Sequence, residues 1–256
     1  MTRAAVEVAP GVHVMTSRRY ATTSTVVFAG AEALVVDPCW DADELTGVAA
    51  FLAAAQTQCA AGLATHLHYD HVLWHPDLGE VPRWSSVWAA DQWGADRAAL
   101  IRPLLGDIPD DLVELAGHVT PVPDAGLPWR GRDIVLHEHD AHARGHLAIE
   151  IVDDAVLLAG DMLSDVELPY PDADATDLTS YLEGLDRLAE VVQRSRVLVP
   201  GHGTPTYSPI ERLDADRRYL DAVLTGRLVD DPRMADSDNR DIHARTLEQA
   251  RATHLT

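Results

Sequence analysis

The sequence predicts an α/β (α+β) fold of the αββα sandwich type, in which two β-sheets pack face to face between outer helices. A unit of short strands, a helix and a buried strand occurs twice along the chain. In both halves, polar residues follow directly after the apolar strand-like runs. Two such halves can bury one face of each sheet against the other and bring their polar strand ends to a shared edge. We expect the functional site at that edge.

The first half begins with three short runs that are typical of paired antiparallel strands. Pro10-Gly11 and Gly30 mark the turns between them. A helix is predicted next, with Asp41 as its N-cap and Glu44 completing a capping box. A short run, GLATH, then leads into a loop rich in candidate ligands. The strand-like runs are VEVAPGVHVM (6–15), TVVFAG (25–30) and EALVVD (32–37), and the apolar stripe of the helix is Leu45, Val48, Ala49 and Leu52.

The second half repeats this order. Strand-like runs fill residues 133–161, a helix is predicted at about 177–193, and the buried run RVLVPGHG follows. We expect one domain over residues 1–256, with a Trp-rich helical insertion at about 72–130 and a helical C-terminal extension at about 208–256. The Trp residues of the insertion are expected mainly to pack, with one or two free to line a substrate pocket or lid. They are Trp74, Trp84, Trp88 and Trp93.

The charge of the chain is strongly unbalanced. Forty-one acidic residues face twenty basic ones, and all twenty are Arg because the sequence has no Lys. A Schiff-base lysine and a P-loop lysine are therefore excluded, and the net charge of -21 disfavours nucleic acid. Cys39 and Cys59 make neither a disulfide framework nor a CxxC pair, and no apolar run approaches the ~18 residues of a membrane span. We expect a cytoplasmic protein with a small-molecule substrate and no nucleic-acid or membrane partner; a homodimer stays an open alternative.

The heptad THLHYDH at residues 65–71 is the first candidate site. His66 and His68 are two positions apart, which places both imidazoles on one side of an extended segment. Asp70 and His71 follow directly, so that a turn after His68 can direct two more ligands toward a second point nearby. Two neighbouring metal ions need a divided ligand set of this kind. A His-rich loop that binds no metal is the alternative.

Three further candidates each follow a predicted strand. His142 lies in HDAHARGHLAIEI, Asp161 closes AVLLAGD and His202 closes RVLVPGH. A single His or Asp at a strand end is usually a turn or cap residue. Four separate fragments that converge on one ligand set are rarely accidental, so we interpret all seven residues as one metal centre.

Together these motifs resemble the metallo-β-lactamase superfamily over about residues 5–210. The resemblance rests on HxHxDH, the HARGH element, the Gly-Asp after a buried strand and the final Pro-Gly-His-Gly. Asp37, in LVVDP, resembles the family's strand-end aspartate that supports the metal loop. The resemblance implies the αββα fold and two metal sites that Asp161 bridges. The implied ligands are His66, His68 and His142 for one metal, and Asp70, His71 and His202 for the other.

The activity implied by this resemblance is that of a dinuclear metal-dependent hydrolase. Two Zn²⁺ ions are the default for a His/Asp set, with Mn or Fe as alternatives. A bridging hydroxide would attack a carbonyl ester, thioester or lactone. Asp70 is the implied catalytic residue, which orients the hydroxide and carries its proton toward the leaving group. An aspartate at position 161 favours the glyoxalase II-like thioesterases, lactonases and phosphodiesterases over the β-lactam-cleaving members.

Departures from the family pattern leave the substrate open. The Pro-Gly turn before His142 is missing, Ser164 stands where lactonases have Tyr, and the Lys-rich glutathione-binding surface is absent. The expected pocket rim, residues 160–177, is acidic and disfavours polyanionic substrates. The alternatives are a mononuclear iron enzyme of the persulfide dioxygenase type, a phosphodiesterase, and a non-catalytic metal-binding protein.

Supporting roles are expected for three residues beside the ligands: Asp37, His146 and Ser164. For His146, contact with ligands or substrate and a purely structural hydrogen bond are equally compatible with the sequence. The remaining candidates are expected to be exposed or supporting histidines (His75, His137 and His139), a surface salt bridge or substrate contact (Arg144), and a buried inert thiol (Cys39).

Overall fold

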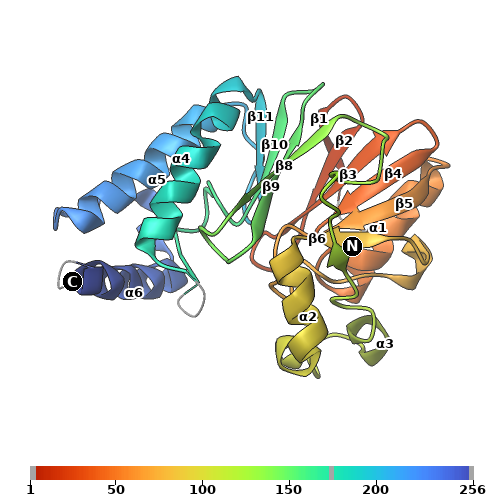
Figure 1. Cartoon of the computed structure of the whole chain (residues 1–256), viewed down its shortest axis with the longest axis horizontal. Helices are drawn as coiled ribbons and strands as arrows, with labels where there is room; N and C mark the ends of the chain where they lie inside the picture. The colour runs from red at the N-terminus through yellow and green to blue at the C-terminus, as the bar shows by residue number, and fades with distance from the viewer. Residues whose placement is uncertain (1–3, 173–175, 254–256) are drawn as a thin grey trace.

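The computed structural model describes residues 4–172 and 176–253, and it confirms the predicted αββα sandwich (Figure 1). The strands are β1 (Val6–Ala9), β2 (Val12–Thr16), β3 (Thr23–Ala29), β4 (Glu32–Val36), β5 (Gln58–Leu63), β6 (Arg83–Ser85), β7 (Thr120–Pro121), β8 (Ile134–His139), β9 (His146–Ile151), β10 (Val156–Gly160) and β11 (Val197–Pro200). The helices are α1 (Ala42–Ala54), α2 (Val87–Leu100), α3 (Asp110–Val113), α4 (Leu178–Arg194), α5 (Pro209–Leu224) and α6 (Ser237–Thr253). Single 3₁₀ turns are η1 (Pro76–Leu78), η2 (Arg102–Leu104) and η3 (Pro232–Ala235).

Two sheets form the centre of the molecule. The first has the order β1-β2-β3-β4-β5-β6-β7, antiparallel as far as β4 and parallel from β4 onward. The second has the order β11-β10-β9-β8, in which only β10 and β11 run parallel. Because β5, β10 and β11 each end near the same edge, the loops that follow them meet there, as the sequence predicts.

The main core lies between the two sheets. Val27 and Leu34 of the first sheet belong to the same buried cluster as Ile149, Leu158 and Val199 of the second. Every residue of β9, β10 and β11 is buried, which explains why β10 and β11 read as continuous apolar runs rather than alternating ones. This close packing fixes the relative position of the loops at the strand ends.

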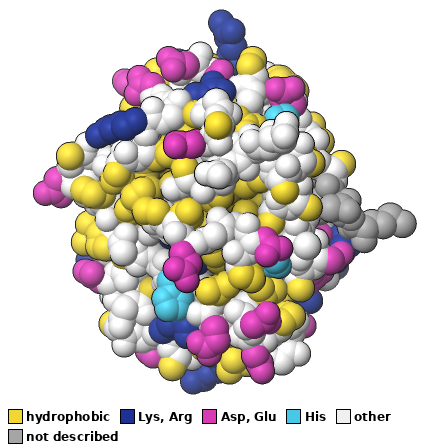
Figure 2. Space-filling view, turned by 90° about the vertical axis from the view of Figure 1, so that its right-hand side faces the viewer, with side chains coloured by type: hydrophobic (Ala, Val, Ile, Leu, Met, Phe, Trp, Pro, Cys, Tyr) yellow, Lys and Arg dark blue, Asp and Glu magenta, His cyan; other side chains and the backbone are white. Residues whose placement is uncertain are grey.

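Helices cover the outer faces of both sheets. The apolar stripe of α1 packs on the first sheet through Val48, Ala49 and Leu52. On the other side, α4 and α5 cover the second sheet, and α6 packs beside them (Figure 1). Figure 2 shows the side of the molecule that carries α1, where apolar side chains lie between acidic ones and Arg side chains are dispersed.

The predicted capping box of α1 is wrong. Asp41 is the N-cap residue, but its side chain makes no capping hydrogen bond; its carboxylate pairs with Arg18 and Arg19 instead. Glu44 is fully buried and accepts hydrogen bonds from the Ser17 hydroxyl at 2.6 Å and the Arg18 backbone N–H at 3.0 Å. The two acids thus tie α1 to the loop after β2, because that loop offers basic and hydroxyl donors that a local sequence pattern does not reveal.

The Trp-rich segment packs against the heptad loop, residues 65–71. The indole N–H of Trp93, which is 2% exposed, donates to the Leu67 carbonyl at 2.9 Å, inside the heptad. Trp74 donates to the Gly79 carbonyl, Trp84 belongs to the core between the sheets, and Arg144 lies over the ring of Trp88. Through Trp93, the segment therefore supports the backbone of the heptad.

The chain beyond Gly203 adds α5, η3 and α6. The terminal helix α6 has 17 residues. Residues 254–256 of the expected extension lie outside the described part. Within the described ranges, no helix is long and apolar enough to cross a lipid bilayer.

Candidate metal centre

The heptad follows β5 as a series of turns rather than an extended segment, yet its side chains converge as expected. Asp37, at the end of β4, accepts hydrogen bonds from the Thr65 backbone N–H at 2.8 Å and the Thr65 hydroxyl at 2.6 Å. With Trp93 bound to the Leu67 carbonyl, these contacts hold both the start and the middle of the loop. His66 and His71 are fully buried, whereas the side chain of His68 is 28% exposed.

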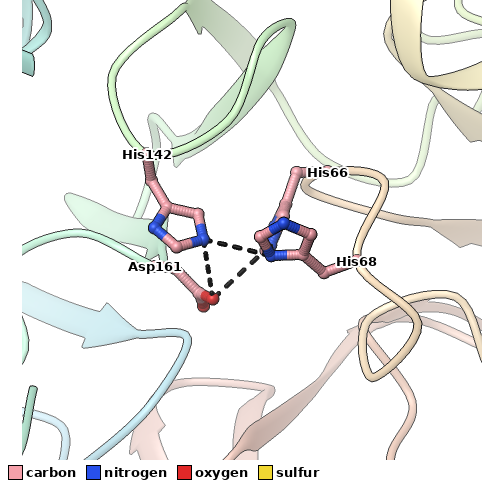
Figure 3. A group of neighbouring side chains, drawn as sticks. All are labelled: His66, His68, His142 and Asp161. Carbon is pink, nitrogen blue, oxygen red and sulfur yellow. Dashed lines mark hydrogen bonds and ion pairs between the residues drawn. The ribbon is translucent and has the colours of Figure 1, made fainter. Parts of the chain in front are cut away.

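A first group of donor atoms comes from three separate loops (Figure 3). His66 Nε2 and His142 Nε2 lie 2.9 and 3.1 Å from His68 Nδ1. Asp161 Oδ2 lies 3.4 Å from both His66 Nε2 and His142 Nε2. Four tetrahedral ligands about 2.0–2.1 Å from a cation lie about 3.3 Å from one another. The observed spacing therefore fits a single small cation between these four atoms.

A second group is formed by Asp70, His71 and His202, all buried. Asp70 Oδ2 lies 3.5 Å from His71 Nε2 and 3.3 Å from His202 Nε2. Asp161 approaches this group as well, with Oδ1 3.2 Å from His71 Nε2 and Oδ2 3.3 Å from His202 Nε2. Asp161 thus contacts the donor atoms of both groups.

Two atoms of this cluster indicate whether a metal ion fits between the donors. Within the described residues, His71 Nε2 and Asp161 Oδ1 are buried and lie 3.2 Å apart as an ion pair, but neither makes a hydrogen bond. Burying a polar atom without a hydrogen bond is costly, and a cation between the donors removes that cost. The donor chemistry, imidazole nitrogen with carboxylate oxygen, suits Zn²⁺ and other divalent first-row metals.

In three of the histidines, a hydrogen bond at Nδ1 determines which ring nitrogen faces the other donor atoms. His71 Nδ1 lies 3.0 Å from Asp37 Oδ2, His142 Nδ1 lies 2.8 Å from the Tyr170 carbonyl, and His202 Nδ1 lies 2.9 Å from the Tyr20 carbonyl. An N–H directed at each of these oxygens leaves Nε2 as the free lone pair, which is the usual arrangement of metal-binding histidines. His68 is turned the other way, with Nε2 3.4 Å from Asp172.

The supporting residues act through the backbone of the ligand loops. His146 Nε2 accepts the Asp161 backbone N–H at 3.1 Å, so His146 positions Asp161 and is no part of either donor group. Ser164 donates to the His202 carbonyl at 2.7 Å and accepts the backbone N–H groups of Val166 and Glu167.

Ionisation favours the binding forms of several donors. Burial lowers the pKa of His142 to about 4 and that of His66 well below its usual value, so both are neutral at pH 7. Burial also opposes the charged form of His71, but the carboxylates of Asp161, Asp70 and Asp37 outweigh it and raise its pKa. For Asp161, His202 and His71 outweigh the effect of burial and lower the pKa. In metal-free protein the raised pKa of His71 therefore keeps a positive charge in the second group, and a bound cation would replace that charge.

A cavity of ≈300 Å³ opens beside the two groups. Part of the expected rim lines it, namely Leu163, Ser164, Glu167, Leu168 and Tyr170; residues 173–175 of that rim lie outside the described part. The expectation that Trp74, Trp84, Trp88 or Trp93 lines a substrate pocket is wrong for this cavity, because its lining contains no residue of the segment 72–130, all of which is described. Sequence reasoning missed Tyr20, Tyr181, Asp216 and Ile242.

The remaining candidates lie outside the donor groups. His139 stacks on His146 with ring centroids 4.7 Å apart, and His137 pairs with Glu150. His75 accepts the Asp77 backbone N–H at the start of η1. Arg144 stacks over Trp88, and Cys39 is fully buried with its Sγ 3.2 Å from the Ser24 hydroxyl.

The fold and the two donor groups define an αββα protein with a His/Asp cluster that could hold metal at the shared edge of its sheets. A family model described as the metallo-beta-lactamase superfamily matches residues 18–209, and the chain belongs to this superfamily. No curated protein matches the sequence.

Solved structures of the same fold are similar over most of the chain. One is a metallo-beta-lactamase family protein from Thermus thermophilus, with 24% identity, a TM-score of 0.61, and 86% of this chain and 83% of that one covered. A metallo-beta-lactamase from Erythrobacter litoralis, with β-mercaptoethanol in its active site, has 18% identity, a TM-score of 0.62, and coverage of 84% and 96%. A beta-lactamase domain protein from Burkholderia ambifaria has 18% identity, a TM-score of 0.64, and coverage of 87% and 75%. Likeness at this level shows the fold.

Proposed function

We propose that this protein is a dinuclear metal-dependent hydrolase that cleaves a carbonyl ester, thioester or lactone. The observation that carries the proposal is the pair of buried donor groups, joined by Asp161, beside a cavity of small-molecule size. In the proposed site, His66, His68 and His142 hold one cation, Asp70, His71 and His202 hold the other, and Asp161 bridges them. Zn²⁺ is the expected metal, with Mn or Fe as alternatives.

When bound, the cations supply a water of lowered pKa and polarise the carbonyl oxygen of the substrate. The chain's own contribution begins with Asp70, which lies both in the second donor group and in the cavity lining. Its carboxylate is placed to orient the attacking water and to move a proton toward the leaving group. Because Asp70 is buried, it keeps this position without competition from bulk water.

Two observations favour this activity over its alternatives. A second complete donor group supports a dinuclear centre over a mononuclear iron enzyme of the persulfide dioxygenase type, which needs only one. Among the described residues, the cavity lining contains no Arg, and phosphodiester substrates are usually held by basic side chains. A carbonyl substrate without a phosphate group suits this lining better.

The test is metal analysis of the purified protein together with a panel of ester, thioester, lactone, β-lactam and phosphodiester substrates. We expect about two equivalents of metal and cleavage of a carbonyl substrate that stops on chelation and returns when metal is restored. One equivalent of iron with oxygen consumption in the presence of glutathione persulfide would establish the dioxygenase alternative instead. Full metal occupancy with no turnover of any substrate in the panel would favour a non-catalytic metal-binding protein.

A further inference from the structure

We infer that the cavity selects an uncharged substrate group that has an apolar body and a hydrogen-bond acceptor, with Tyr181 as the donor to that acceptor and Glu167 as the group that excludes anions. This inference rests on the proposed function for the identity of the reacting bond. The cavity, at ≈300 Å³, is at the small end of the usual ~300–1,000 Å³ range of ligand pockets, so the selected group is small.

The apolar part of the wall comes from two segments far apart in sequence. Leu163 and Leu168 lie in the loop after β10, and Ile242 lies on α6. Leu163 and Leu168 are 1% and 3% exposed, so their side chains are packed in place in the absence of substrate. A preformed apolar wall favours hydrocarbon by about 25 cal/mol per Å² of surface removed from water.

Tyr181 packs its ring in the core beneath the second sheet and presents its hydroxyl as an uncharged polar group of this wall. It projects from α4, lines the cavity and is 1% exposed. Its hydroxyl makes no hydrogen bond with any described residue, and its neighbours Asp216 and Glu167 help burial to raise its pKa well above the usual value. It therefore remains a protonated donor, and a buried tyrosine hydroxyl normally has a partner. The missing partner is an acceptor atom of the substrate.

Glu167 is the acidic side chain of the lining that is neither in the proposed ligand set nor paired with Arg. Burial raises its pKa to about 7, so its carboxylate is charged above that pH. Its Oε1 lies 3.6 Å from His202 Nδ1, which already has the Tyr20 carbonyl as a closer partner. Asp216, the other acid of the lining outside the proposed ligand set, is paired with Arg233 at 2.7 Å. The basic side chains of the described lining, His68, His142 and His202, all belong to the proposed ligand set, so a carboxylate on the substrate would meet Glu167 with no further basic side chain to offset the repulsion.

Residues beyond the family-matched segment hold this wall in place. Arg233, in η3, donates to the carbonyls of Ser164 and Glu167, both at 2.9 Å. Asn239, on α6, accepts the Leu168 backbone N–H at 3.0 Å and donates to the Val166 carbonyl at 2.6 Å. Because η3 and α6 follow residue 209, where the family match ends, part of the support of this wall lies outside the matched segment.

The test measures binding rather than turnover, so it separates this inference from the proposed hydrolase activity. Three hydroxamic acids of one shape are titrated calorimetrically, about one pH unit above the pKa of Glu167, into protein loaded with two equivalents of Zn²⁺. 5-Methylhexanohydroxamate ends in an apolar group, 5-oxohexanohydroxamate in a ketone, and 4-carboxybutanohydroxamate in a carboxylate. We expect the ketone to bind most tightly and the carboxylate at least about tenfold more weakly than either of the others, a difference of ~1.4 kcal/mol.

Two substitutions assign the selectivity to residues. Glu167→Gln should bring the carboxylate probe to within about threefold of the apolar one, while Glu183→Gln, which removes the same charge from an exposed position on α4, should change nothing. Tyr181→Phe should weaken the ketone probe about 3- to 10-fold and leave the apolar probe unchanged. Tyr207→Phe, at a tyrosine that is 69% exposed, is its control.

Equal or tighter binding of the carboxylate probe, failure of all three probes to bind, or unchanged selectivity in Glu167→Gln and Tyr181→Phe would overturn the inference. The expected binding order without turnover of any ester, thioester or lactone would keep the inference for the cavity and reject the hydrolase. Thermal melting of each variant checks that the fold is retained.

Discussion

Replacing Asp37 by Asn tests how the fold prepares the second donor group. Asp37 is 3% exposed, and one of its oxygens, Oδ2, receives both the Thr65 hydroxyl at 2.6 Å and His71 Nδ1 at 3.0 Å. Its other oxygen accepts the Thr65 backbone N–H at 2.8 Å. The Asn side-chain oxygen can accept the Thr65 backbone N–H in place of Oδ1, but its NH₂ group then faces the Thr65 hydroxyl and His71 Nδ1, which are both donors. The variant therefore loses the charged acceptor that orients His71.

The size of the effect follows from these contacts. Hydrogen bonds to a charged group contribute about 1.5–3 kcal/mol each, and the smaller cost of burying an uncharged amide offsets part of that loss. We expect metal-free Asp37→Asn to lose about 2–4 kcal/mol of unfolding free energy. Loss of such a partner to a metal-binding histidine costs 10- to 100-fold in metal affinity, which is ~1.4–2.7 kcal/mol, and we expect it at the second zinc only.

The assay is stepwise competition for Zn²⁺ with a chromophoric chelator, together with urea denaturation of the metal-free protein. Asp77→Asn is the matched control, because Asp77 also lies beside a histidine, 3.7 Å from His75 Nδ1, but its side chain is 71% exposed. Binding of both zinc equivalents by Asp37→Asn at wild-type affinity would refute the role given to Asp37.

Three further predictions concern the bridge, the packing and the pH dependence. Asp161→Ala should weaken both metal equivalents because Asp161 contacts both donor groups, whereas His142→Ala should weaken one, and metal analysis after dialysis distinguishes the two results. Gly117→Ala should destabilise the protein by about 2–4 kcal/mol in urea denaturation, because a Cβ there would lie 1.9 Å from the Trp93 ring and the backbone φ is +73°. Gly126→Ala is the control for the backbone strain alone, because its φ is +89° and a Cβ there would meet open space. Equal losses of stability in the two variants would contradict the packing argument. Burial lowers the pKa of His139 to about 3, so on acidification the unfolded chain takes up the proton before the folded protein does. The neutral, buried His139 therefore contributes to the free energy of unfolding in full above about pH 6.5, and this contribution is lost as the pH falls toward 3. Between pH 7 and 5 the loss is about 2 kcal/mol, and His139→Gln should reduce the pH dependence of metal-free unfolding by that amount; identical pH profiles would contradict it.

The parts of the molecule that follow from local patterns were predictable. Strands β10 and β11 of the second sheet are continuous apolar runs because both of their faces are buried, and the polar residues that follow them converge because the strand ends share one edge. For the same reason His66, His142, Asp161 and His202 meet although they are far apart in sequence.

The parts that depend on distant contacts were not predictable. Tyr181 occupies the apolar face of α4 three residues after Leu178, so its spacing is that of a core residue, and only the position of α4 shows that it reaches the cavity. The partners of Glu44 lie in the loop after β2, which no capping pattern reveals. Ile242 enters the wall because Asn239, one turn earlier on α6, is bound to the loop after β10.

The central claim is that two donor groups joined by Asp161 hold two cations that act on a carbonyl substrate. The most direct measurement is the metal content of the purified protein, followed by ester, thioester and lactone hydrolysis before chelation, after chelation and after metal is restored. The account predicts about two equivalents of metal and an activity that disappears and returns with them. Less than one equivalent of metal, with hydrolysis unaffected by chelation, would contradict it.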